Sequence, residues 1–198
     1  MGHLRTHLAA ANAAVANRFL AAGTAMKVGA YAVANSGAMP TEGARHVTIT
    51  HTAVGAADTL GTITFTGRSL AGETISEEVT PTSGGVATGA KWFASVTGMT
   101  GAGWATNTGD DTISIGCGSE VIVSEGNGDL HGIAVNTTAA GAITLADAAG
   151  TIAVLKASIP EDLYEYGVRF GGYLKVTLAA ASDVTVIHTG SMPGYSAG

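Results

Sequence analysis

Histidines are the residues of this sequence best suited to bind a metal ion, and two pairs of them lie close together in the chain. His3 and His7 are four residues apart, a spacing that places two imidazoles on one face of a helix. No carboxylate lies near them in the sequence, so we interpret them as a surface pair. His46 and His51 are five apart and face opposite sides of a strand. The sequence therefore predicts no metal site and no cofactor.

Carboxylates occur as two adjacent pairs, Asp110-Asp111 and Glu77-Glu78. A glycosidase needs two carboxyl groups that face each other across a cleft, whereas neighbours on a strand point to opposite faces. We interpret Asp110-Asp111 as a turn before a strand, with a calcium-binding loop as the alternative. The sequence has neither a Gly-x-Ser-x-Gly nucleophile motif nor a phosphate-binding glycine loop. We therefore expect a protein that is not an enzyme.

The single cysteine and the few aromatic residues are expected in the interior. Cys117 has no partner for an intrachain disulfide or a Cys-type zinc site, so a buried thiol is predicted. Each aromatic side chain can bury about 150–250 Å², which favours a place in the core. Exposed rings at Tyr164, Tyr166 or Trp104 would instead indicate sugar binding.

The chain has 198 residues and an unusually low content of charge. Charged residues make up 12%, against a usual share of roughly 25%. Either polar threonine, serine and asparagine cover the surface, or neighbouring chains do, and we favour neighbouring chains. The net charge is −6 without a basic run, so no nucleic acid is expected as a partner. No segment reaches the ~20 apolar residues of a membrane span, and no secretory signal is evident, which predicts synthesis in the cytoplasm without membrane contact.

Residues 3–22 are rich in alanine and contain neither proline nor glycine. Apolar residues recur there at steps of three or four, which predicts a helix with one narrow apolar stripe. An extended arm that becomes ordered on a partner is the alternative. Either form would serve for docking, and we expect residues 1–22 to be dispensable for folding of the rest. The stripe consists of Leu4, Leu8, Ala11, Val15, Phe19 and Ala22.

From His46 onward the apolar residues alternate with polar ones, as in HVTITHTAV and GTITFTG. Such alternation predicts half-buried antiparallel strands, and turn signals about every ten residues are typical of a sandwich. The polar segment SEGNGD, residues 124–129, is expected to be a linker. The predicted fold is all-β, with two tandem antiparallel β-sandwich modules and an N-terminal helix or arm. Its parts are an N-terminal segment with a lead-in strand over 1–45, a first sandwich over 46–123 and a second over 130–198.

The two halves repeat the same strand signals in the same order. VTITHTA matches IAVNTTA, GTITFTG matches GAITLAD, ETISEEVTP matches TIAVLKASIP, and DDTISIG matches SDVTVIH. The shared order and spacing favour a duplicated module. The alternative is one larger sandwich whose hairpins share common turn chemistry.

These segments resemble structural proteins of tailed bacteriophage virions, which commonly carry Gly/Thr-rich β-sandwich modules in tandem. The resemblance rests on HVTITHTAVGAADTLGTITFTG, ATGAKWFASVTGM and DDTISIG in the first half, and on LHGIAVNTTAAGAITLADAAG, YGVRFGGYLKVTL and DVTVIH in the second. It spans most of residues 46–190. It implies a virion component, such as a capsid decoration or head-fibre protein or a tail protein, and it transfers no catalytic residue.

We therefore expect a non-enzymatic protein of the virion. It would be either a capsid decoration (cement) protein or a head spike. It would bind the major capsid protein or other virion proteins, and its own copies as a homo-oligomer. Assembly contacts are expected from Leu4, Leu8, Val15 and Phe19. A tube or distal tail protein is one alternative, and a carbohydrate-binding module is the other.

Overall fold

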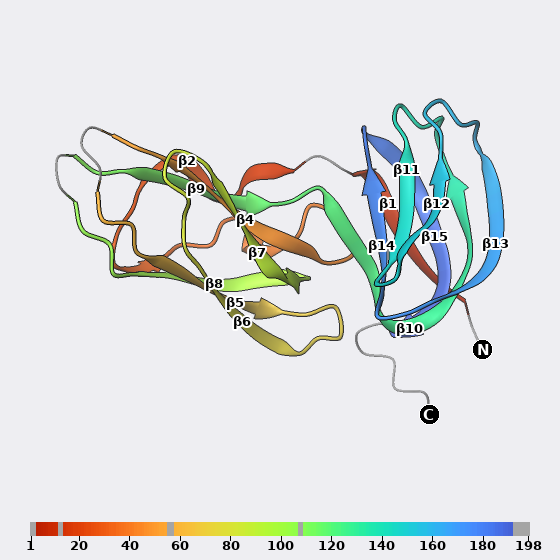
Figure 1. Cartoon of the computed structure of the whole chain (residues 1–198), viewed down its shortest axis with the longest axis horizontal. Coiled ribbons are helices and arrows are strands. Elements are labelled where there is room, and N and C mark those ends of the chain that lie inside the picture. The colour runs from red at the N-terminus through yellow and green to blue at the C-terminus, as the bar shows by residue number, and fades with distance from the viewer. Residues whose placement is uncertain (1–2, 12–13, 55–57, 107–108, 192–198) are drawn as a thin grey trace.

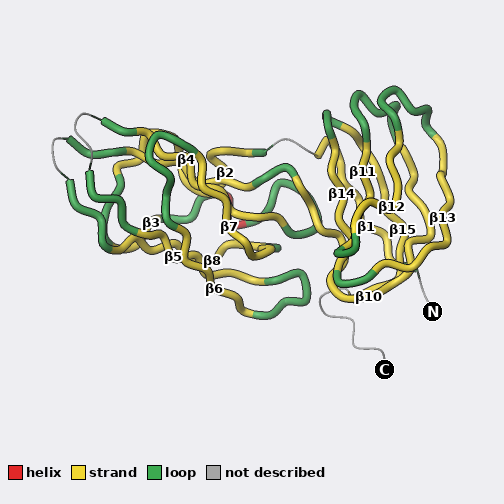
Figure 2. The backbone as a smooth tube through the Cα atoms, viewed as in Figure 1, coloured by secondary structure: helices red, strands yellow, loops and turns green. Residues whose placement is uncertain are grey.

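The chain forms two antiparallel β-sandwich modules that lie end to end (Figure 1; Figure 2). The computed structural model describes residues 3–11, 14–54, 58–106 and 109–191. Within these ranges every regular element is a β-strand, apart from a short 3-10 turn at Asn35–Gly37. The predicted all-β class is thus confirmed. No helix in the described ranges is long and apolar enough to cross a membrane.

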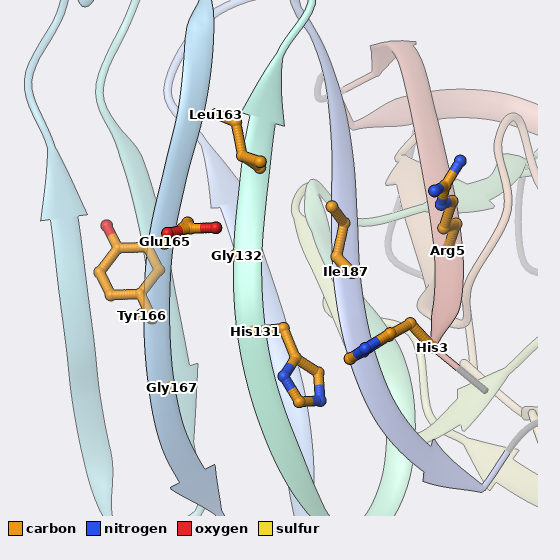
Figure 3. Close-up of a pocket in the computed structure, with 9 residues that line it drawn as sticks. All are labelled: His3, Arg5, His131, Gly132, Leu163, Glu165, Tyr166, Gly167 and Ile187. Carbon is orange, nitrogen blue, oxygen red and sulfur yellow. The ribbon is translucent and has the colours of Figure 1, made fainter. Parts of the chain in front are cut away.

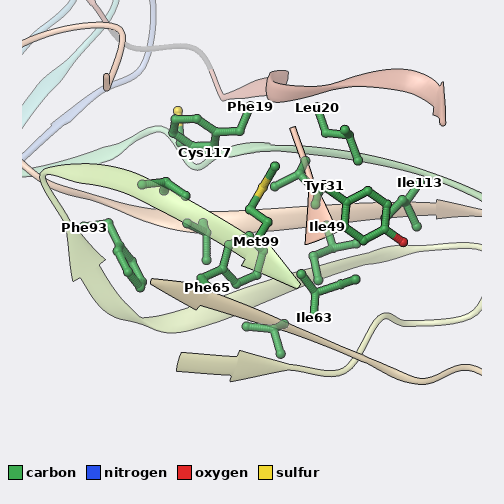
Figure 4. Packing of buried hydrophobic residues seen from close by; sticks show 14 of the residues in the cluster. Phe19, Leu20, Tyr31, Ile49, Ile63, Phe65, Phe93, Met99, Ile113 and Cys117 are labelled. Atoms are coloured by element: carbon green, nitrogen blue, oxygen red, sulfur yellow. The ribbon is translucent and has the colours of Figure 1, made fainter. Parts of the chain in front are cut away.

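Module 1 is built from strands β2 to β9. One sheet has the order β2-β9-β4-β7 and the other the order β3-β8-β5-β6. Their inward side chains, among them Ile49, Ile63 and Phe65, meet in one core (Figure 4). The strands are β2 (Val15–Ala25), β3 (Gly29–Tyr31), β4 (Arg45–Thr52), β5 (Thr62–Arg68), β6 (Thr74–Val79), β7 (Val86–Phe93), β8 (Ser95–Ala102) and β9 (Thr112–Cys117).

Module 2 is built from the first strand and the last six. These are β1 (Leu4–Ala11), β10 (Glu120–Val135), β11 (Ile143–Asp147), β12 (Gly150–Leu155), β13 (Asp162–Phe170), β14 (Tyr173–Leu178) and β15 (Ser182–Ser191). The first half of β10 pairs with β14, which continues to β11 and β12. Its second half pairs with β13 and β15, and β1 lies beyond β15. The long strand β10 therefore belongs to both layers, which enclose a second core around Leu8, Ile133 and Val176.

The predicted linker at 124–129 is in fact part of β10. Its beginning pairs with β14 and its end with β13, so the strand passes from one layer to the other here. Gly126 has a φ of 82°, and a Cβ atom on Gly128 would lie 1.9 Å from the carbonyl oxygen of Thr189. The linker prediction was wrong because a polar, glycine-rich composition also suits a bend within a strand. The chain passes between the modules at residues 118–119 instead.

Both modules have the same strand order. The sheet β2-β9-β4-β7 corresponds to β1-β15-β10-β13, and the run β8-β5-β6 corresponds to β14-β11-β12. Strand β3 has no counterpart among the described residues of module 2. The segments that repeat in the sequence, such as GTITFTG and GAITLAD, occupy the equivalent strands β5 and β11. Two separate cores with one topology favour a duplicated module over a single larger sandwich.

The N-terminal segment forms two edge strands, and the predicted helix over 3–22 was wrong. β1 pairs with β15 in module 2, and β2 pairs with β9 in module 1, so residues 1–45 are shared between the modules. Leu8 and Phe19 are completely buried in the two cores. Leu4 and Leu8 fit a period of two as well as a step of four, so the pattern was ambiguous. The open edges of β15 and β9 then supply hydrogen-bond partners for β1 and β2.

A small apolar cluster joins the two modules. Ala44 and Ile122 exchange two backbone hydrogen bonds of 2.9 Å, and both residues are buried. Trp92 from module 1 and Tyr173 from module 2 pack against them, with ring centroids 6.4 Å apart. The modules are therefore in direct contact as well as being linked through the chain.

Replacing Leu8 with alanine should destabilise module 2 by about 2–5 kcal/mol, because the side chain is fully buried in that core. Hydrogen exchange followed by mass spectrometry should show faster exchange over residues 120–191 and little change over 45–102. Val154→Ala, at a position that is 58% exposed in the same module, is the control and should leave exchange unchanged. Unaltered protection of module 2 in Leu8→Ala would contradict the role of β1 in its core.

Glu77 of β6 covers part of the free edge of β7. Its carboxylate accepts hydrogen bonds from the backbone N–H groups of Ala90 and Lys91. The Lys91 ammonium in turn donates to the carbonyl oxygen of Ser76 at 2.7 Å. These contacts occupy backbone donors with which a strand of another molecule could otherwise pair.

Replacing Glu77 with alanine should therefore increase self-association, because it frees the edge donors of β7. Sedimentation velocity at increasing protein concentration would measure this relative to the unaltered chain. Glu78→Ala removes a neighbouring exposed carboxylate of equal charge and should have no such effect. Identical sedimentation of the two variants would show that Glu77 does not protect the edge.

Candidate functional site

An open pocket of about 460 Å³ lies on module 2, where four strands of one sheet contribute side chains (Figure 3). One cross-strand row crosses it. Arg5 on β1 pairs with Ile187 on β15, Ile187 pairs with Gly132 on β10, and Gly132 pairs with Glu165 on β13. Paired residues on adjacent strands project to the same face, and this row faces away from the core. Gly132 therefore leaves a gap in the row, between Ile187 and Glu165.

An irregularity in strand pairing shapes the pocket. His131 is an extra residue of β10 relative to β15, and it lies opposite two residues of β13, Tyr166 and Gly167. Gly167 has a φ of 79°, a backbone conformation that favours glycine. Bulges of this kind redirect side chains and are frequent beside functional sites. Here the bulge brings His131 and Tyr166 into the lining of the pocket.

Three histidines gather beside the bulge. The rings of His3 and His131 pack edge to face with centroids 4.2 Å apart. The Nε2 atom of His131 is buried and has no hydrogen-bond partner among the described residues. His188 is wholly buried, and its Nε2 lies 3.2 Å from Oγ1 of Thr6. Burial, together with the nearby His131, lowers the pKa of His188 to about 4, so this ring is neutral at neutral pH.

A buried histidine–aspartate pair lies in module 1. His51 Nε2 is 3.0 Å from Asp111 Oδ2, and both side chains are almost completely buried. His51 Nδ1 accepts a hydrogen bond from the N–H of Gly84, and Asp111 Oδ1 accepts one from the N–H of Val54. Because Nδ1 accepts, Nε2 carries the proton and donates it to Asp111. Neither nitrogen is free for proton transfer, so the pair holds loops together.

These loops present three exposed valines, which we call the end valines. Val28, Val54 and Val86 are 65%, 43% and 57% exposed. The backbone N–H groups of Met26 and Val54 donate to Asp111, which anchors the segments beside the first two. Val54 follows the end of β4 and Val86 begins β7, so both lie at the opposite end of their sheet from Cys117, where the chain leaves for module 2.

The four residues predicted to mediate assembly are divided between the two modules. Leu8 and Phe19 are completely buried, and Leu4 and Val15 are half-buried. Val15 packs against the core of module 1. A side chain inside its own core cannot contact another molecule, so the assignment was wrong for Leu8 and Phe19. Because each core includes one of these side chains, we now expect removal of residues 1–22 to destabilise both modules.

Other candidates from the sequence take structural positions. Cys117 is buried as predicted, and burial raises the pKa of its thiol. Tyr164, Tyr166 and Trp104 are partly exposed and pack against the two cores. In the described ranges, no group of three or more histidine, cysteine, aspartate or glutamate side chains could hold a metal ion. His7, one of the proposed surface pair, is exposed and lies 2.7 Å from Asp183.

The pocket was missed because its residues are far apart in the chain and carry no local motif. Arg5 and Ile187 come from the first and last strands, and only pairing of β1 with β15 brings them together. The sequence matches no protein family, and searches of curated proteins and of solved structures gave no significant match.

The buried His188 should make folding sensitive to acid. Its pKa is about 4 in the folded chain, against 6.5 for a free histidine, so the unfolded chain takes up this proton at a higher pH. The free energy of unfolding should consequently fall by up to about 3 kcal/mol as the pH drops from about 6.5 to about 4. His188→Gln, which can still bond to Thr6, should flatten this part of the curve. Urea unfolding at a series of pH values measures the slope, and equal slopes in both proteins would contradict the lowered pKa.

Proposed function

We propose that this chain is a non-enzymatic structural protein of a tailed-phage particle, a capsid decoration or head-spike protein that binds the capsid lattice and its own copies. The observation that carries the proposal is the arrangement of two sandwiches with one topology, placed end to end. Repetition of a rigid module extends a surface without creating a reaction centre. The resemblance of both halves to phage virion proteins points the same way.

Exposed apolar residues at separate places on the molecule support contacts with more than one neighbour. The end valines lie on module 1. On module 2, Val154 is exposed on β12, and Leu163 and Val168 are exposed on β13. Such residues at protein–protein contacts would also account for the low charged fraction of the chain.

The proposal predicts that the chain is a component of purified particles of the phage that encodes it. Quantitative mass spectrometry should find it in a fixed ratio to the major capsid protein, and immunogold labelling should place it on the head. Its absence from purified particles would contradict a structural role, and labelling confined to the tail would contradict a decoration role.

A variant with aspartate at all three end valines adds a test of the contact surface. Charges buried at an interface without partners are costly, so its incorporation should fall by about tenfold or more. Thr97→Asp, at an exposed position on β8, is the control and should be incorporated normally. Equal incorporation of both variants would exclude the end valines from the capsid contact.

A further inference from the structure

The surface equivalent to the pocket is filled in module 1. His46 directly precedes VTITHTA and Gly132 directly precedes IAVNTTA, so the two residues are equivalent in the repeat. His46 pairs with Trp92 on β7, and the two rings lie against each other with centroids 3.6 Å apart and planes tilted by 35°. Gly132 pairs with Glu165 on the equivalent strand β13 and contributes no side chain. The two modules share one topology, but side chains cover this surface in module 1, whereas an open pocket lies there in module 2.

Gly132 is also required by its surroundings. A Cβ atom at this position would lie 2.8 Å from the carbonyl oxygen of Tyr164, closer than a side chain normally approaches backbone. The bulge that adds His131 thus fixes a glycine next to it, and the glycine keeps the middle of the row open. The floor beside this gap is the apolar side chain of Ile187.

The two ends of the row carry opposite charges. Arg5 and Glu165 are separated by three strand spacings, roughly 14 Å between their backbones. Both are exposed, and in the described part of the chain neither has an ion pair or a hydrogen bond through its side chain. They are too far apart to pair directly with each other. The pocket therefore offers an unpaired cation at one end and an unpaired carboxylate at the other (Figure 3).

We propose that this pocket binds an acidic saccharide, in which a sugar ring carries a carboxylate. The Arg5 guanidinium would pair with the carboxylate of the sugar, in the two-pronged geometry that favours arginine. Glu165 would accept hydrogen bonds from hydroxyl groups, and Ile187 would contact the apolar face of the ring. The imidazole of His131, which lines the pocket, would contact the sugar ring.

The size and charge of the pocket favour this class of ligand over others. A volume of about 460 Å³ falls within the usual range for small-molecule sites, roughly 300–1,000 Å³. A phosphate-rich ligand is disfavoured because the negative charge of Glu165 would repel it. Among the described lining residues, Arg5 alone carries a permanent positive charge. A metal ion lacks the required cluster of ligands in the described ranges. The proposal does not depend on a place in a phage particle.

The test is an NMR titration of the full chain with the methyl glycosides of glucuronic acid, N-acetylneuraminic acid and glucose. At least one acidic glycoside should shift the amide signals of residues 3–5, 131–132, 163–167 and 187. It should bind about tenfold or more tightly than the neutral glucoside, since a charge-assisted contact contributes more than a neutral one.

Two variants separate the roles of the charged ends. Arg5→Gln should abolish the preference for the acidic glycoside, whereas Glu165→Gln should weaken binding of acidic and neutral glycosides alike. Arg169→Gln, which removes an arginine that is 92% exposed elsewhere on β13, is the control and should bind as the unaltered chain does. Circular dichroism of each variant verifies that it is folded.

Three outcomes would overturn the proposal. One is the absence of shifts at these residues with either acidic glycoside up to about 10 mM, well above the millimolar affinities of weak sites. Another is an unchanged preference for the acidic glycoside in Arg5→Gln. The third is displacement of the sugar by an equal concentration of inorganic phosphate, which would indicate a general anion site.

Discussion

The rest of the structure depends on one constraint: each of the first two strands pairs with the last strand of one module. β1 closes module 2 against β15, and β2 closes module 1 against β9. The chain therefore begins in module 2, builds module 1 completely and returns to finish module 2. Each core includes a side chain from the N-terminal segment, Leu8 in one and Phe19 in the other. Module 1 is thus a continuous piece of sequence, β2 to β9, placed between the first strand and the last six strands of module 2.

Strand β10 transmits this arrangement from one module to the other. Its first residues carry Ile122, which bonds to Ala44 of module 1, and its later residues enter both layers of module 2. A strand that serves two layers must bend, and the glycines at 126 and 128 allow it to do so. The same strand then contains the bulge at His131. Contact between modules, closure of the second sandwich and the shape of the pocket thus depend on one segment.

Polar side chains differ in their use between the structural contacts of module 1 and the pocket of module 2. In module 1, His51 and Asp111 bond to each other and to backbone groups, and Glu77 occupies edge donors of β7. These groups are satisfied within the protein and stabilise loops and edges. In module 2, Arg5 and Glu165 line a pocket without partners in the described part of the chain. Unsatisfied polar groups around a cavity are available to a ligand, and this distinguishes the pocket from the histidine–aspartate pair.

The sequence by itself determined the class of fold, the repeat and the positions of most strands. Alternation of threonine with Val, Ile and Phe has only one structural interpretation when one face is buried, and it recurs in matching order in both halves. Two assignments failed for the same reason. An alanine-rich segment and a polar, glycine-rich segment each have weak local preferences, and their conformations depend on which strands lie beside them. Sheet pairing between distant strands decided that residues 4–11 and 15–25 are edge strands and that 124–129 bends within β10. The same pairing placed Arg5 and Ile187 side by side, because hydrogen bonds across a sheet join residues without regard to their separation along the chain.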